Sequence, residues 1–120
     1  MDITVWYLST CSTCSRILKQ LDLDASKAQL IDIKSHPVTG SQLEVMKEAT
    51  GSYKELINGR SIQFRNMDKK ARDLSESEAK NLLLKHYAFL KRPVIQIDGE
   101  CFVGNSKKTL EEVKNKINNG

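Results

Sequence analysis

Two cysteines in the pattern Cys11-Ser12-Thr13-Cys14 are the residues best suited to chemistry. Cys11 stands where a helix is expected to begin, and there free backbone N–H groups and the positive end of the helix dipole stabilise a thiolate. Cys14 follows one helical turn later, where it can attack a mixed disulfide on Cys11 and release the bound partner. The spacing therefore favours thiol–disulfide exchange with Cys11 as the nucleophile.

Zinc binding and plain packing are the alternatives for this cysteine pair. Structural zinc takes four ligands, usually as two close pairs, and Cys101, His36 and His86 supply no second pair. Unreactive buried thiols are common in protein cores, and Cys101 is most simply a packing thiol of this kind. Redox chemistry without a metal or a bound cofactor is the favoured interpretation.

Two arginines are candidates for holding an anion. Arg92 directly precedes Pro93 at the start of an expected strand, where a proline removes a backbone donor from the sheet. Arg60 taken alone is ordinary surface charge. It opens a basic segment that we interpret mainly as a solvated face, and as an anion or partner site only in second place. The segment sets five cations against Asp68: Arg60, Arg65, Lys69, Lys70 and Arg72.

Length and composition indicate one globular domain. The chain has 120 residues, of which 39% are hydrophobic and 28% charged, and this excludes disordered and fibrous classes. The net charge of +4 comes from cations interleaved with carboxylates, so no direct nucleic-acid or membrane binding is expected. The longest strongly apolar run, residues 5–8, is far shorter than the ~20 residues of a membrane span. Asp2 interrupts any basic signal start, and we expect a cytoplasmic protein.

The first part of the chain predicts a β-α-β unit. Residues 3–8 are apolar, β-branched and aromatic, as in a buried strand. Residues 12–22 carry apolar side chains at three- and four-residue steps, which predicts a helix with one buried stripe. Residues 29–33 alternate as a second strand, and the intervening helix makes the two strands parallel.

The rest of the chain predicts helices, then a hairpin and a last helix. Residues 41–49 form a helix ended by Gly51, and residues 53–57 form one further short turn. Ser75 and Glu78 make a capping box that begins a helix running through His86. Residues 94–97 and 101–103 flank Asp98-Gly99, a dipeptide typical of tight hairpins. Residues 106 or 107 to 118 form the final helix, whereas residues 60–73 give no clear prediction.

This order predicts an α/β fold with a thioredoxin-like plan. The four strands form a mixed sheet with flanking helices, and a helical insertion of about residues 39–90 lies between the second and third strands. The prediction is a single domain spanning residues 1–120.

With these residues in view, the chain resembles the arsenate reductase and Spx family of thioredoxin-like proteins. The similarity covers nearly the whole chain, and it rests on several segments together. These are Cys11 to Cys14, Asn58 to Ser61 with Phe64-Arg65, Lys91 to Ile95, and Phe102-Val103-Gly104. The resemblance implies that Cys11 is the nucleophile, that Pro93 is a cis-proline of the active site, and that Arg60 and Arg92 hold an oxyanion.

The resemblance also implies a function. Cys11 would act on arsenate or another small thiol-reactive substrate, and Cys14, glutathione or glutaredoxin would complete the cycle, with thioredoxin as a further possible partner. Two features depart from glutaredoxin-linked arsenate reductases: those enzymes have one cysteine in the active turn, and Gly104 falls where they carry a third arginine.

A regulator of the Spx type is the alternative from another class. Such a protein binds RNA polymerase and uses a cysteine pair, here Cys11 and Cys14, as a redox switch. Gly51, Arg60-Ser61 and Phe64 favour this alternative, because they lie in a segment similar to the one that Spx uses for its partner. A thioredoxin-like module with idle thiols is the third possibility.

Overall fold

The computed structural model describes residues 1–68, 70 and 73–119, and these residues divide into two compact units. The first unit combines Met1–His36 with the described residues from Arg92 onward, and the second consists of those within Pro37–Lys91. That the two together make a single domain stays a prediction. In the described ranges, no helix has the length and apolar character needed to cross a membrane.

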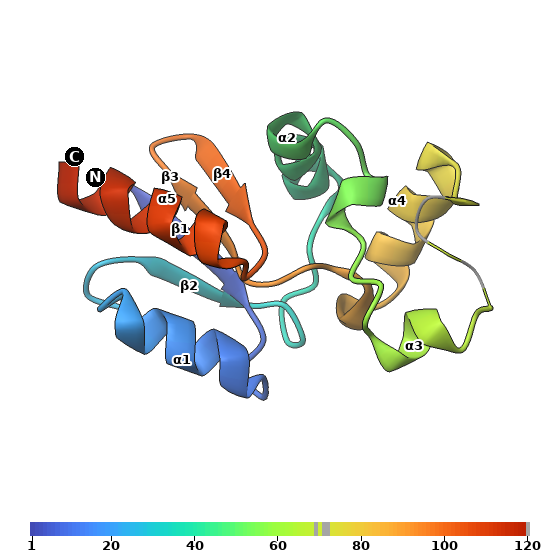
Figure 1. Cartoon of the computed structure of the whole chain (residues 1–120), viewed down its shortest axis with the longest axis horizontal. Helices are drawn as coiled ribbons and strands as arrows, with labels where there is room; N and C mark the ends of the chain where they lie inside the picture. The colour runs from blue at the N-terminus through green and yellow to red at the C-terminus, as the bar shows by residue number, and fades with distance from the viewer. Residues whose placement is uncertain (69, 71–72, 120) are drawn as a thin grey trace. The chain divides into compact units, whose positions relative to one another are not determined.

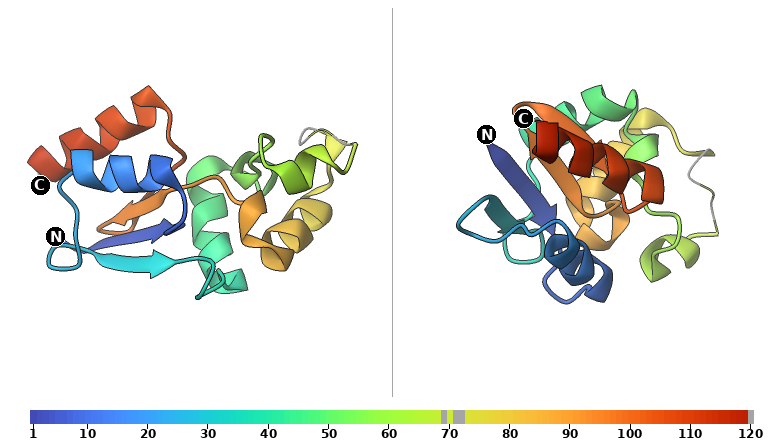
Figure 2. Two further views of the ribbon diagram at one scale, coloured as in Figure 1. Left: turned by 90° about the horizontal axis from the view of Figure 1, so that it is seen from below. Right: turned by 60° about the vertical axis from the view of Figure 1, so that its left-hand side comes forward.

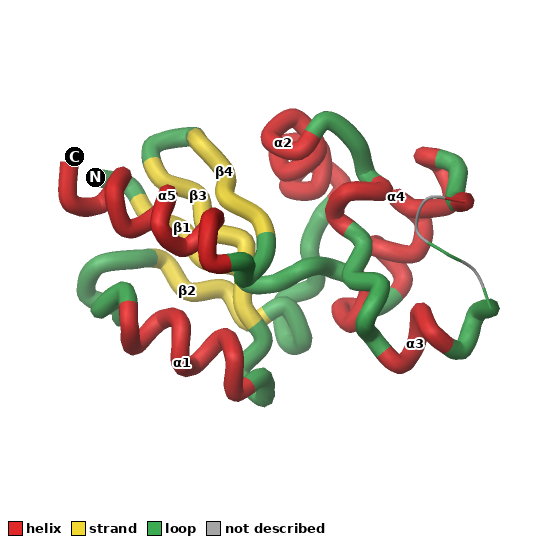
Figure 3. The backbone as a smooth tube through the Cα atoms, in the orientation of Figure 1, coloured by secondary structure: helices red, strands yellow, loops and turns green. Residues whose placement is uncertain are grey.

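The first unit is built on a four-stranded sheet with the order β2-β1-β3-β4 (Figure 1). The strands are β1 (Ile3–Tyr7), β2 (Gln29–Asp32), β3 (Val94–Ile97) and β4 (Glu100–Val103). β2 runs parallel to β1, whereas β3 is antiparallel to both β1 and β4. Figure 3 shows these strands in yellow, all in this unit. The predicted mixed sheet and its α/β class are therefore confirmed.

The turn between β3 and β4 is the tight hairpin that the sequence predicts. Asp98 and Gly99 both have positive φ, at 49° and 90°. This backbone matches the right-handed twist of the flanking strands, and glycine and aspartate tolerate it better than most residues. The turn sets the antiparallel register, in which Ile97 pairs with Glu100 and Val94 with Val103.

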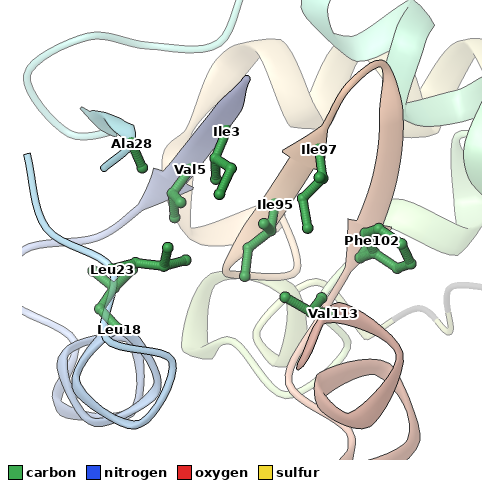
Figure 4. Packing of buried hydrophobic residues seen from close by; sticks show 9 residues of the cluster. All are labelled: Ile3, Val5, Leu18, Leu23, Ala28, Ile95, Ile97, Phe102 and Val113. Atoms are coloured by element: carbon green, nitrogen blue, oxygen red, sulfur yellow. The ribbon is translucent and has the colours of Figure 1, made fainter. Parts of the chain in front are cut away.

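Two helices, α1 (Ser12–Gln20) and α5 (Lys107–Asn119), cover one face of this sheet (Figure 2). Strand side chains alternate between faces, so the paired residues Val5, Ile95 and Phe102 point toward the helices together. Figure 4 shows the resulting core. It consists of Ile3, Val5, Leu18, Leu23, Ala28, Ile95, Ile97, Phe102 and Val113.

Helix α1 is shorter than predicted. It ends at Gln20 instead of Asp22, although the N–H of Leu21 still donates to the carbonyl of Ile17 at 2.9 Å. Asp22 has a φ of 54°, a left-handed conformation that no α-helix can continue. The apolar stripe therefore extends one residue past the helix.

The second unit is helical in its described residues, with a single isolated bridge between Ile57 and Leu90. Its elements are α2 (Gly40–Thr50), η1 (Lys54–Leu56), α3 (Ile62–Arg65), α4 (Glu76–Lys85) and η3 (Tyr87–Phe89). Ser75 and Glu78 form the predicted capping box of α4. α2 begins with a second capping box, which our sequence analysis missed.

The predicted end of α4 is wrong. The helix stops at Lys85, because His86 adopts an extended backbone with a φ of −154°. The ring Nδ1 of His86 accepts a hydrogen bond from the N–H of Ala88 at 3.0 Å and so begins η3. Histidine here is a capping residue. Of the basic segment 60–72, Lys69 and Arg72 lie outside the described residues.

Inside the second unit, one carboxylate joins two elements. Glu76 accepts hydrogen bonds from the backbone N–H groups of Tyr53, at 2.9 Å, and Lys54, at 3.1 Å. These donors stand at the start of η1, where no partner within that short helix exists for them. Glu76 thereby fixes the start of η1 to the start of α4.

We expect Glu76→Ala to lower the free energy of unfolding by about 1–3 kcal/mol, since it leaves two partly buried donors without their acceptor. Glu55→Ala is the matched control, because Glu55 is exposed and its substitution should change stability by less than ~0.5 kcal/mol. Urea denaturation followed by circular dichroism measures both. Equal losses in the two variants would contradict this role for Glu76.

Candidate active site

Cys11 lies in the turn between β1 and α1. Its backbone N–H donates to the carbonyl of Leu8 at 3.0 Å, which closes the turn, and Cys11 is then the N-cap of α1. Its side chain is partly exposed. A nucleophile at this point is held by rigid elements on both sides and remains open to a substrate.

Arg92 and Pro93 lie at the same end of the sheet as Cys11, directly before β3 begins. β3 is antiparallel to β1 and Val94 pairs with Trp6, so the residues just before β3 lie beside those that follow β1. The Arg92–Pro93 peptide bond is cis, the isomer that the family resemblance implies. The carbonyl of Pro93 accepts a hydrogen bond from Gly104 at 3.0 Å, which joins this end of β3 to the residue that follows β4.

The surroundings of Cys11 favour its thiolate. Partial burial, the largest single influence, acts to raise the pKa of Cys11. Hydrogen bonds from the backbone N–H and thiol of Cys14, together with the hydrogen bond and charge of the Arg92 guanidinium, outweigh it. The pKa is therefore lowered. The Cys11 side chain makes no capping hydrogen bond of standard geometry at the start of α1.

Cys14 has the opposite character. Its side chain is completely buried on the inner face of α1, next to Ile17 and Leu18 in the apolar stripe. Burial, with a smaller contribution from the neighbouring Cys11 charge, raises the pKa of Cys14 to about 11, although a hydrogen bond with the Leu8 backbone acts to lower it. Cys11 and Cys14 are 3.7 Å apart, and both are free thiols. A protonated, buried thiol thus stands in reach of an activated one.

Asp32 fixes the chain just before Cys11, a contact that our sequence analysis missed. The hydroxyl of Ser9 donates to the Asp32 carboxylate at 2.6 Å, and the N–H of Lys34 donates to it at 3.2 Å. The Ser9 hydrogen bond is the main reason why the pKa of Asp32 is lowered. Serine and aspartate in loops are common, so sequence alone carries no sign that these two meet.

The remaining candidates belong to other elements of the chain. Arg60 belongs to the second unit and is exposed, and its N–H donates to the side-chain oxygen of Asn58 at 3.1 Å. Its part in an oxyanion site stays a prediction. Cys101 is half-buried in β4, and burial raises its pKa, as expected of a packing thiol. The described residues contain no group of three or more His, Cys, Asp and Glu placed to hold a metal ion.

The order and directions of the four strands, with Cys11 in the turn after β1, define a thioredoxin-like fold. Within that class, the model of the ArsC family matches residues 6–113 of this chain. The chain therefore belongs to the ArsC family.

Individual relatives agree with this assignment. An uncharacterized protein of Haemophilus influenzae is 29% identical over 112 residues, which cover 91% of this chain and 96% of that protein. The global transcriptional regulator Spx of Streptococcus mutans is 24% identical over 103 residues, covering 85% and 75%. A crystal structure described as a possible arsenate reductase from Streptococcus mutans superposes with a TM-score of 0.67 at 29% identity, covering 91% of this chain and 97% of that one.

The opposite pKa shifts predict unequal labelling of the two thiols. Cys11 should react with iodoacetamide at a lower pH than a free cysteine, whose pKa is about 8.5, whereas Cys14 should stay unlabelled until far higher pH. Arg92→Ala removes one donor and its positive charge and should raise the pKa of Cys11. Peptide mass spectrometry after labelling at a series of pH values reads out each site separately.

Lys19→Ala is the matched control, since Lys19 is an exposed cation on α1 that does not act on either thiol. It should leave the labelling midpoint of Cys11 unchanged. Equal reactivity of Cys11 and Cys14 would contradict the assignment of nucleophile and buried partner.

Proposed function

We propose that this ArsC family protein is a thiol–disulfide oxidoreductase in which Cys11 is the nucleophile. The observation that carries the proposal is the pairing of an activated thiol with a buried one at 3.7 Å. Arg92 gives further support to the proposal. Its guanidinium favours the Cys11 thiolate and can also neutralise negative charge on an incoming anion.

With arsenate as substrate, the first step forms a sulfur–arsenic bond. The Cys11 thiolate attacks arsenic(V), and one arsenate oxygen leaves as water after taking up protons. Arg92 stabilises the remaining negative oxygens, and Arg60 is proposed to do the same. Charge-assisted hydrogen bonds from guanidinium groups are the strong ones for such an oxyanion.

In the second step Cys14 attacks the sulfur of Cys11. A disulfide forms, the sulfur–arsenic electron pair stays on arsenic, and arsenic(V) leaves as arsenite, with the Cys14 proton passing to an arsenite oxygen. Two thiols are oxidised and one arsenate is reduced, so the electrons balance. Glutathione can take the place of Cys14, and glutathione or glutaredoxin is proposed to reduce the enzyme again.

A disulfide is the other thiol-reactive substrate that the site supports. The Cys11 thiolate attacks one sulfur and the second sulfur leaves as a thiolate. Cys14 then attacks Cys11 and releases the first partner as a thiol. This cycle needs one activated sulfur and one resolving sulfur, and both lie in α1 and its N-cap.

We expect arsenate turnover to be slow while the Cys11–Cys14 disulfide forms readily. Gly104 takes the place of a third arginine, and loss of one donor to a charged transition state costs about 10² to 10³ in rate. Arsenate reduction with glutathione and glutaredoxin should therefore be weak in the wild type and weaker still in Arg92→Ala. The disulfide is measured by mass spectrometry after mild oxidation.

Cys11→Ser is the control that abolishes both reactions. Fast arsenate reduction by the wild type would show that the loss of a third cation is unimportant. An oxidised protein that lacks the Cys11–Cys14 disulfide would contradict the proposal itself. Gly104→Arg is a poor test, because Gly104 has a φ of 94°, which side-chain-bearing residues rarely adopt.

A redox-switched regulator of the Spx type is the second candidate. The similarity to Spx of Streptococcus mutans favours it, because that protein is a global transcriptional regulator. On this proposal, oxidation of Cys11 and Cys14 to a disulfide changes the protein's affinity for RNA polymerase, and no substrate is turned over. Binding to RNA polymerase that differs between reduced and oxidised protein, together with no turnover of arsenate or disulfides, would favour the regulator.

A further inference from the structure

A groove lies between the two helices that cover the sheet of the first unit. α1 and α5 run over the same face (Figure 2), and the groove between them has a volume of about 520 Å³. Leu21 and Leu110, both half-buried, are its apolar lining residues. Leu21 also packs against the core of the first unit, so the groove lies directly over that core.

The rim of the groove is positively charged. Arg16 on α1 and Lys107 and Lys114 on α5 line it, against the single carboxylate of Glu111, and all four side chains are exposed. None of them forms an ion pair with another described residue. An excess of unpaired cations over an apolar lining suits an anionic partner that also has apolar side chains.

The cations on α5 are spaced along the groove with an apolar side chain between them. Lys107 and Lys114 stand seven residues apart on α5, close to two full helical turns, so they share a face and are separated by about 10 Å along the axis. Leu110 lies between them on that face. This arrangement is matched by a peptide segment with two carboxylates flanking an apolar side chain, because such a segment can pair with both lysines and cover Leu110.

One end of the groove lies near the reactive thiol. Arg16 follows Cys11 by five residues, about 7.5 Å along α1. Asn105, another lining residue, comes directly after Gly104, whose N–H is hydrogen-bonded to Pro93. A segment lying in the groove would therefore extend toward the end of the sheet at which Cys11 stands.

We propose that this groove docks an acidic segment of a partner protein, so that a disulfide or thiol of that partner meets Cys11. The proposal rests on the proposed thiol–disulfide function and specifies its partner: an acidic protein. In the exchange step, the Cys11 thiolate bonds to one sulfur of the partner's disulfide, and the other sulfur leaves as a thiolate.

The probe is a short helical peptide with two glutamates seven positions apart around a leucine, and with a terminal cysteine activated as a disulfide with 5-thio-2-nitrobenzoate. Its control replaces both glutamates by glutamine. Wild-type protein should react with the acidic peptide roughly fivefold faster than with the neutral one, the size expected of two exposed ion pairs. The preference should fall as salt is added, because the pairs are solvent-exposed.

Lys114→Glu should abolish the preference for the acidic peptide. Lys108→Glu is its matched control: it makes the same charge change on an exposed residue of the same helix that does not line the groove. It should keep most of the preference. Equal loss in both variants would show a general effect of net charge and overturn the proposal.

Docking is separated from thiol chemistry by a peptide with serine in place of the cysteine. Fluorescence anisotropy should show that it binds wild-type protein more tightly than Lys114→Glu, even if Cys11 reacts with nothing. Failure of the thiol reaction with retained binding would contradict the proposed function alone. Tighter binding of a single-stranded oligonucleotide of equal charge would overturn the docking proposal in favour of a nucleic-acid site.

Discussion

The antiparallel pairing of β1 with β3 is the constraint on which the site depends. Val94 opposite Trp6 brings the end of one strand to the start of the other, and Arg92 then meets Cys11. A slip by one residue would turn every side chain of β3 to the other face. The apolar row of Val5, Ile95 and Phe102 prevents such a slip, because it must stay against α1 and α5. Core packing and thiol activation are therefore fixed by the same register.

The same packing separates the two thiols in character. Cys14 shares the inner face of α1 with Ile17 and Leu18, so the helical period that builds the core also buries this sulfur. Cys11 stands before the helix and stays partly exposed. Burial stabilises the protonated form of a thiol, whereas donors and a cation stabilise the charged form. Two chemically identical side chains thus acquire different roles from position alone.

Local sequence patterns predicted the elements and the burial of Cys14 well, because their causes are local. The hairpin follows from Asp98-Gly99, the start of α4 from Ser75 and Glu78, and the buried position of Cys14 from helical spacing. Features decided by contacts between distant segments were missed. The Ser9–Asp32 hydrogen bond joins residues that are 23 positions apart, and neither residue carries a local signal.

The end of α4 at Lys85 is another feature that local sequence patterns did not predict. The apolar period continues to His86, so periodicity extended the helix, but the histidine ring offers its nitrogen to the N–H of Ala88. A side chain that satisfies a backbone donor competes with the helix, and the outcome depends on geometry that spacing does not encode. Arg60 is a related case, because its link to Cys11 rests on family resemblance alone.

The backbone at Gly104 bears on which substrate the site suits. Its N–H reaches the carbonyl of Pro93, and its φ of 94° is one that a side chain disfavours. The link between the end of β4 and the start of β3 therefore has a backbone that disfavours an arginine at this position. Binding of an oxyanion with several negative oxygens is strengthened by each added cation. A disulfide carries no charge to neutralise, and its reduction needs only an activated attacking thiolate and a resolving thiol. Within the proposed thiol chemistry, Arg92 and glycine at position 104 therefore favour a disulfide over arsenate as the substrate.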